Sequence, residues 1–343
     1  MIAKRLCLPR FLRTSSKLYT AINTVNTDFP PRQLLVKVEE IPDLPFVEHI
    51  TLPFKHFKPT AAPPPDYTKT PVLFLHGLFG WKNNYRSVGQ SISSKTSHPV
   101  YALDLRNHGD APHVLPHTYS AMAEDVYDFL LDRQWQKVIL IGHSMGAKVA
   151  MIVSLLYPEL VEKLVVIDNT PHHQPLGEQY QRDLLAMCII ESEKIGFKQG
   201  TRGRILDKKV INEMLKLYEP DHTVREFLMS NLITSVDQKR RTYHDKEGFR
   251  PPVMNFYKHG IIENLGGWPH ILPEIKFSKP VLVLKATKSD FVKIPDYLFE
   301  FEKYFDDFVV EEIDSGHWIT SENPQAFVDV TVKFLVPEQE STN

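Results

Sequence analysis

The chain has 343 residues, of which 42% are hydrophobic and 24% are charged, and its formal net charge at pH 7 is −2. These proportions are those of a globular protein with a large core, and they exclude disorder throughout the chain. The small net charge provides no basic field for wrapping nucleic acid, so we expect no nucleic-acid partner. No apolar run approaches the ~20 residues of a membrane span, so none is expected.

The first 27 residues differ in composition from the rest of the chain. They contain five basic residues among hydroxyl and scattered apolar residues, and the first acidic residue is Asp28. This composition is typical of a mitochondrial transit peptide, so we expect residues 1–27 to direct the protein to mitochondria. Pro9, Arg10 and Arg13 interrupt the apolar centre that a secretory signal would need. A disordered basic tail is the alternative interpretation.

Strand-like runs come next, at Leu34–Val38 and Val47–Leu52, and the prolines between Pro59 and Pro65 then break the pattern. They predict an N-terminal hairpin and a turn-rich connection. From residue 71, short apolar runs alternate with helical patterns; the runs are Val72–Leu75, Val100–Leu103, Val138–Ile141, Leu164–Ile167, Val281–Leu284 and Phe308–Ile313. Because these runs lack polar alternation, they predict an α/β fold whose mostly parallel central sheet carries helices on both faces.

The alternation of strands and helices stops between residues 172 and 276. Helical patterns fill this segment at Gln179–Ile195, Asp207–Tyr218 and Val224–Ser235. An insertion of this length predicts a helical cap over the carboxyl ends of the strands, where ligands bind in such folds. The expected organisation is therefore a core formed by residues 28–171 and 277–336, a cap at 172–276 and a tail at 337–343.

The strongest motif is the sequence Gly142-His143-Ser144-Met145-Gly146, which follows an apolar strand and precedes a helical run. A serine on a sharp strand-to-helix turn exposes its hydroxyl next to the amino terminus of the helix. Glycines are needed on both sides because side chains there would crowd the neighbouring strand and helix. A bare GxSxG is also found in surface turns, but this context predicts that Ser144 is a nucleophile.

A serine nucleophile needs a histidine base and a carboxylate that orients the base. His317 is the candidate base, because it lies in a loop after the last predicted strand. Two carboxylates compete for the third position: Asp290 follows the strand at Val281–Leu284, and Asp168 follows the strand before it. Either could reach the histidine, because neighbouring strand ends lie only ~5 Å apart. The usual chain order of nucleophile, acid and histidine favours Asp290.

An oxyanion hole is expected from the backbone N–H groups of Met145 and Leu78. Leu78 lies in the glycine-containing loop at His76–Gly80, after the first core strand. Such a donor contributes about 10²–10³ in rate. The remaining histidines near turns and loops are expected to be structural or exposed rather than catalytic; they are His108, His113, His172 and His173.

Taken together, these motifs resemble the α/β-hydrolase superfamily from about residue 70 to residue 336, and the resemblance implies the α/β-hydrolase fold. The segments His76–Gly80, Asp104–Gly109 and Gly142–Lys148 look like mitochondrial abhydrolase-type esterases, and most closely like the yeast ethanol acetyltransferase group. In that group the acid is the aspartate after the strand that follows the nucleophile turn. The corresponding residue here is Asp168, so the resemblance favours Asp168 over Asp290.

The resemblance implies acetyl transfer from acetyl-CoA to ethanol, with thioester and ester hydrolysis as side activities. The expected partners are small-molecule acyl esters or thioesters and alcohols, with acetyl-CoA as a co-substrate and no cofactor. A mitochondrial carboxylesterase or thioesterase without a transferase role is the first alternative, and a noncatalytic binding protein with a hydrolase fold is the second. The sequence has no HExxH motif, so no metal site is expected. Lys239, Arg240 and Arg241 could contact CoA, although a solvated charged face is the simpler interpretation.

Overall fold

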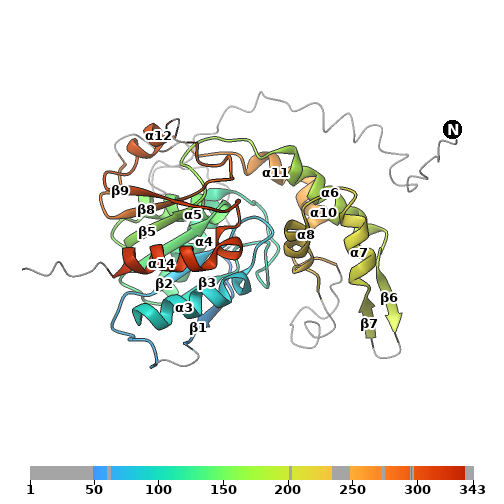
Figure 1. Cartoon of the computed structure of the whole chain (residues 1–343), viewed down its shortest axis with the longest axis horizontal. Helices are drawn as coiled ribbons and strands as arrows, with labels where there is room; N and C mark the ends of the chain where they lie inside the picture. The colour runs from blue at the N-terminus through green and yellow to red at the C-terminus, as the bar shows by residue number, and fades with distance from the viewer. Residues whose placement is uncertain are drawn as a thin grey trace, which may run out of the picture.

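A seven-stranded sheet forms the centre of the protein in the computed structural model (Figure 1). The strand order is β1-β3-β2-β4-β5-β8-β9, and every neighbouring pair is parallel except β1 with β3. The strands are β1 Phe54–Phe57, β2 Val72–Leu75, β3 Val100–Leu103, β4 Val138–His143, β5 Val161–Ile167, β8 Val281–Ala286 and β9 Phe308–Ile313. The predicted α/β fold with a mostly parallel sheet is therefore confirmed, and the six apolar runs after residue 71 all lie in strands.

The structure describes residues 49–59, 63–200, 203–233, 248–269, 271, 275–293, 295 and 297–336. The expected transit peptide, the run at Leu34–Val38, the basic residues Lys239–Arg241 and the tail at 337–343 lie outside these ranges. Among the described residues, every helix is too short or too polar to cross a bilayer.

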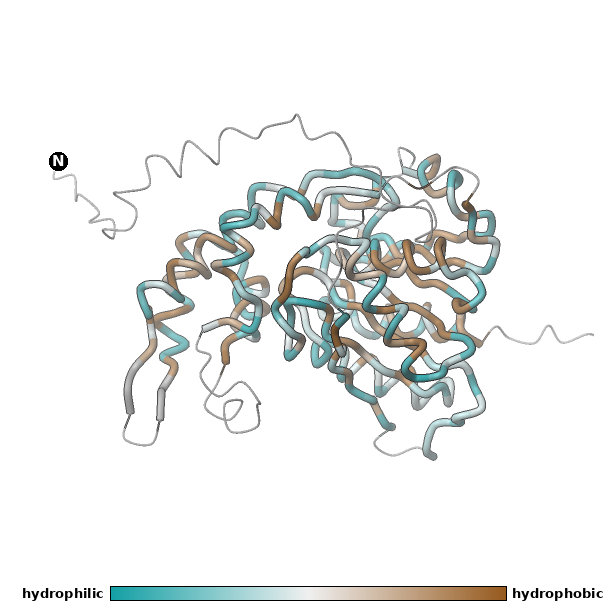
Figure 2. Tube along the Cα trace, turned by 180° about the vertical axis from the view of Figure 1, so that it is seen from behind, coloured by the Kyte–Doolittle hydropathy of each residue, from teal (hydrophilic) through white to brown (hydrophobic). Residues whose placement is uncertain are grey.

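Alternate residues along each strand supply the two halves of the core. Leu73 and Leu75 of β2 belong to a cluster with helices α4 and α5, whereas Val72 and Phe74 belong to a cluster with α3 and α14. Both faces of the sheet are therefore covered, which explains why the central strands are continuously apolar (Figure 2). The four helices are α3 Arg86–Thr96, α4 Tyr119–Asp132, α5 Met145–Leu156 and α14 Pro324–Leu335. Shorter helices are η2 Lys82–Tyr85, α12 Leu298–Glu302 and α13 Ile319–Glu322.

The prediction of a strand at Val47–Leu52 is wrong for residues 49–52, the part of this run that the structure describes. Residues 49–52 form no strand, and the first described strand is β1, which pairs antiparallel with β3. Ile50 and Leu52 are nevertheless buried in the core. Their apolar character therefore reflects burial of a loop rather than strand pairing.

The segment between β5 and β8, here called the cap, forms a separate group of elements beside the sheet (Figure 1). Its elements are α6 Glu178–Ser192, β6 Phe197–Gly200, β7 Gly203–Leu206, α7 Lys208–Leu215, α8 His222–Met229, α10 Val253–Lys258 and α11 Ile261–Asn264. The three helical patterns of this segment correspond to α6, α7 and α8. The antiparallel pair β6–β7 was not expected, because its four-residue strands contain too few apolar residues to form a strand pattern.

One buried lysine joins both ends of the cap to the core. Lys148 of α5 is 2% exposed, and its ammonium donates to the carbonyl oxygens of His172 at 2.9 Å, Gly266 at 3.0 Å and Gly267 at 2.8 Å. His172 follows β5, whereas the two glycines follow α11, so a single side chain ties the entry and exit of the cap. Burial lowers the pKa of Lys148 to about 7.

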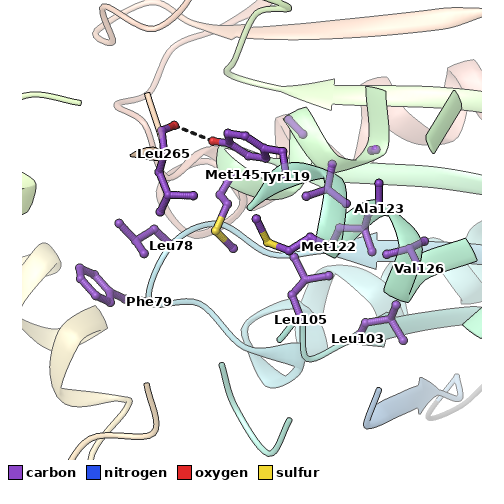
Figure 3. Close-up of a cluster of buried hydrophobic side chains, with 14 of the residues drawn as sticks. Leu78, Phe79, Leu103, Leu105, Tyr119, Met122, Ala123, Val126, Met145 and Leu265 are labelled. Atoms are coloured by element: carbon purple, nitrogen blue, oxygen red, sulfur yellow. Dashed lines mark hydrogen bonds between the residues drawn. The ribbon is translucent and has the colours of Figure 1, made fainter. Parts of the chain in front are cut away.

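A tyrosine reinforces this junction. The hydroxyl of Tyr119, on α4, donates to the carbonyl oxygen of Leu265 at 2.7 Å (Figure 3). The Lys148 ammonium lies 5.5 Å from the centre of the same aromatic ring. The cap exit is therefore held by helices α4 and α5 together.

We expect Lys148→Met to lower the free energy of unfolding by about 3 kcal/mol or more, because hydrogen bonds of a buried charged group contribute about 1.5–3 kcal/mol each. Urea unfolding at pH 6, where the wild-type ammonium is mostly protonated, measures this loss. The matched control is Lys95→Met, because Lys95 pairs with Asp329 at the surface. Exposed pairs contribute at most about 1 kcal/mol, so an equal loss in both variants would contradict the anchoring role of Lys148.

Candidate active site

Ser144 lies on the tight turn between β4 and α5, with φ 53° and ψ −116°. A non-glycine residue seldom adopts positive φ, and a strained turn of this kind exposes the serine hydroxyl. Two hydrogen bonds hold the turn against the end of β5. The Ser144 N–H donates to the carbonyl oxygen of Ile167 at 3.0 Å, and the Asn169 side-chain amide donates to the Ser144 carbonyl oxygen at 2.9 Å.

The glycines around Ser144 leave no room for side chains. A Cβ atom on Gly142 would lie 2.3 Å from the carbonyl oxygen of Gly146, and one on Gly146 would lie 2.2 Å from that of Leu75. A Cβ on Gly77 would lie 3.1 Å from the Ser144 Cβ. The strand, the helix and the loop after β2 can therefore meet closely at the serine only because these positions are glycine.

His317 and Asp168 form a buried pair. The His317 Nδ1 donates to the Asp168 Oδ2 at 2.7 Å, and the Asp168 Oδ1 accepts the backbone N–H of Ala286 at 3.2 Å. Asp168 follows β5, Ala286 ends β8, and His317 lies between β9 and α13, so three neighbouring strands supply the contacts. With Nδ1 donating to the carboxylate, Nε2 is the ring nitrogen able to accept a proton.

Asp290, the other candidate acid, does not contact His317 among the described contacts. Its side chain is 91% exposed, and its carboxylate is 3.6 Å from the Lys293 ammonium. The usual chain order favoured Asp290, but the structure pairs His317 with Asp168, the residue that the resemblance favoured. The physical reason is that the side chain of Asp290 points to solvent, whereas Asp168 directly follows β5, which pairs with β4, the strand before Ser144.

Two neighbouring rings hold the His317 imidazole in place. The Phe291 ring stacks on it with centroids 4.2 Å apart and planes at 22°. The His143 Nε2 donates to the carbonyl oxygen of His317 at 2.8 Å. Burial lowers the pKa of His143 to about 3, so this histidine remains neutral and cannot compete for a proton at pH 7.

Ser144 and His317 line one cavity of about 250 Å³ between core and cap. The loop at His76–Gly80 forms one wall. The cap forms the other through α6 and α8, whose lining residues are Tyr180, Asp183, Thr223, Val224, Glu226, Phe227 and Leu228. A cavity of this size admits a small acyl group or alcohol, with apolar contacts from Val224, Phe227 and Leu228 of α8 and polar side chains from both helices.

Of the two expected oxyanion donors, Leu78 lines this cavity, and Met145 directly follows the cavity-lining Ser144. Met145 is the first residue of α5, and Leu78 lines the cavity from the loop after β2. Both side chains belong to one buried cluster (Figure 3). Among the described residues, neither backbone N–H group has a hydrogen-bond acceptor.

Two residues without an expected role at the site hold the backbone of Phe79, the residue after Leu78. The Phe79 N–H donates to the His108 Nε2 at 3.1 Å, and the buried Asn231 amide donates to the Phe79 carbonyl oxygen at 2.6 Å. His108 was expected to be structural, and it supports this loop from the motif at Asp104–Gly109. Asn231 comes from the cap, in a segment where no sequence motif marks it.

The other histidines singled out from the sequence lie outside the cavity lining. His172 is 3.7 Å from the Glu300 carboxylate, His173 is exposed, and His113 lies 3.0 Å from the carbonyl oxygen of Arg250. In the described part of the chain, no group of three or more His, Cys, Asp or Glu side chains is arranged to hold a metal ion.

Comparison with known proteins agrees with this geometry. Residues 70–324 match the family model described as the alpha/beta hydrolase fold. An abhydrolase domain-containing protein of Schizosaccharomyces pombe is 37% identical over 287 residues, covering 83% of this chain and 97% of the relative. Ethanol acetyltransferase 1 of Wickerhamomyces anomalus is 35% identical over 283 residues, covering 77% and 68%.

Among solved structures, a marine microorganism esterase is similar, with a TM-score of 0.68 and 26% identity, covering 83% of this chain and 99% of that one. The resemblance drawn from the motifs is confirmed by these matches. The family model spans most of the chain, and a relative exceeds one third identity over nearly its whole length. The chain therefore belongs to the α/β-hydrolase family.

Proposed function

We propose that the chain is a serine acyltransferase and hydrolase that forms an acyl intermediate on Ser144. The observation that carries this proposal is the buried hydrogen bond of 2.7 Å between His317 Nδ1 and Asp168 Oδ2, at the cavity that Ser144 also lines. Membership of the α/β-hydrolase family and the names of the relatives support a hydrolase or acyltransferase class. The three side chains would act as nucleophile, base and orienting acid.

In this mechanism the Ser144 Oγ attacks the carbonyl carbon of the acyl donor while His317 Nε2 accepts the hydroxyl proton. The resulting oxyanion accepts hydrogen bonds from the N–H groups of Leu78 and Met145, and the amino terminus of α5 adds a favourable field. The carbon–sulfur or carbon–oxygen bond to the leaving group then breaks. The imidazolium gives its proton to that group, which leaves as a thiol or alcohol, and an acyl-serine remains.

The second half of the reaction decides between transfer and hydrolysis. An alcohol or a water molecule gives its proton to His317 Nε2 as its oxygen attacks the acyl carbon. The bond from that carbon to the Ser144 Oγ then breaks, the imidazolium returns the proton to Oγ, and an ester or a free acid is released. We propose ethanol as the acceptor and acetyl-CoA as the donor, because relatives about one third identical are named ethanol acetyltransferase 1. Acetyl-CoA is then a co-substrate, and the reaction requires no cofactor.

A mitochondrial hydrolase of esters or thioesters, without a transferase role, is the second candidate. The likeness to a marine microorganism esterase favours it, because that chain is matched over 99% of its length. Both candidates use the same acyl-serine and differ only in the acceptor. The proposed mitochondrial location of either enzyme rests on the composition of residues 1–27.

Incubation of the purified protein with acetyl-CoA, with and without ethanol, separates the two candidates. We expect free CoA and ethyl acetate to form together in the presence of ethanol, and Ser144→Ala to abolish both products and labelling by a serine-directed phosphonate. Free CoA without ethyl acetate would select the hydrolase. Undiminished turnover and labelling of the Ser144→Ala variant would refute the acyl-serine itself.

The acid can be tested separately. We expect Asp168→Asn to lower kcat by a factor on the order of 10⁴, because an amide favours the wrong imidazole tautomer and does not stabilise the imidazolium. Asp290→Asn is the matched control, since its side chain lies in solvent. Steady-state kinetics with an ester substrate gives both values. A larger loss in the Asp290 variant would exclude the proposed role of Asp168.

A further inference from the structure

Two buried carboxyl groups lie together in the cap, at the wall of the cavity above Ser144. Asp183 of α6 lines the cavity, Glu219 precedes α8, and each residue is 3% exposed. The side-chain amide of Gln179 donates to both of them, at 3.0 Å to the Asp183 Oδ1 and by a short contact to the Glu219 Oε2. The two carboxyl groups are therefore held by one shared donor.

Their surroundings favour the protonated form of Asp183. The Glu219 Oε1 accepts the backbone N–H of Asp221 at 2.6 Å, so Glu219 has two hydrogen-bond donors, whereas Asp183 shares one of them. Burial, and then the charge of Glu219, raise the pKa of Asp183 to about 7. The Asp183 side chain therefore gains negative charge as the pH rises through this range.

The other charged groups around Asp183 do not neutralise the pair. Arg182 precedes Asp183 in the chain, and its positive charge lowers the pKa of Asp183 less than the other groups around that carboxyl change it. The buried Arg225 of α8 donates to the carbonyl oxygens of Glu219 and Pro220 rather than to a carboxylate. Farther round the cavity lie the phenol of Tyr180, the carboxylate of Glu226 and the imidazoles of His143 and His317.

We propose that Asp183 and Glu219 determine acyl specificity, admitting uncharged acyl chains to the cavity and repelling chains that end in a carboxylate. This inference rests on the proposed function, because it takes the cavity above Ser144 as the acyl-binding site. Like charges repel much more strongly in a buried site than in water. A chain ending in a carboxylate would also lose its hydration there, whereas an uncharged chain meets the apolar residues Val224, Phe227 and Leu228.

The test compares two esters with acyl chains of the same length, 4-nitrophenyl hexanoate and mono(4-nitrophenyl) adipate. The readout is the ratio of kcat/KM for the adipate to kcat/KM for the hexanoate, because pH effects that act equally on both esters cancel in this ratio. We expect the wild-type ratio to fall by about tenfold between pH 6 and pH 8.5, as Asp183 ionises and gains negative charge. The free adipate carboxyl is ionised throughout this range.

Asp183→Asn should raise the ratio by about tenfold at pH 8.5 and remove its pH dependence, because the amide cannot ionise. Glu178→Gln is the matched control, since it removes one charge from an exposed residue of the same helix outside the cavity lining. We expect the control to keep the wild-type ratio at both pH values. If Asp183→Asn does not fold, the wild-type pH profile still tests the inference.

A wild-type ratio near one that does not change with pH, or a ratio unaffected by Asp183→Asn, would overturn the inference. The hexanoate alone reports on the proposed function. If Ser144→Ala hydrolyses the hexanoate as fast as the wild type, the acyl-serine is excluded. Normal, Ser144-dependent hydrolysis of the hexanoate combined with a flat ratio rejects only the role of Asp183 and Glu219.

Discussion

The hydrogen bond between His317 and Asp168 is the interaction on which the rest of the site depends. It joins residues 149 positions apart in the chain, and it is possible only because β5, β8 and β9 are neighbours with the same direction. The second oxygen of Asp168 accepts the N–H that ends β8. The sheet therefore sets the position of the carboxylate, and the carboxylate sets the tautomer and orientation of the imidazole.

The cap and the core form the cavity together, and a few hydrogen bonds fix the position of the cap on the core. Lys148 ties both ends of the cap to α5, while Asn231 ties the cap to the loop at His76–Gly80. The same cap supplies the Asp183 carboxyl to the opposite wall. The shape of the cavity therefore depends on how the cap packs against the core.

Local patterns predicted the strands of the core well, because a strand covered on both faces must be apolar along its whole length. They predicted a strand wrongly at Ile50 and Leu52, because these apolar side chains are buried although their backbone forms a loop and pairs with no strand. They also missed the hairpin β6–β7, since its strands are short and mostly polar. Those two elements depend on what packs against them, which no short window of sequence contains.

Contiguous residues predicted the turn at Ser144, because the strand, the two glycines and the helix that confine this serine follow one another in the chain. The sequence also identified the family, and through the family it favoured Asp168. Only the three-dimensional packing brought Asp168 to His317 and left Asp290 in solvent. It also placed Asp183 on the cavity wall, Glu219 beside Asp183 and Asn231 against the backbone of Phe79. The reason is physical: these contacts form across strand ends and between core and cap, so distance in space, not order along the chain, selects the partners.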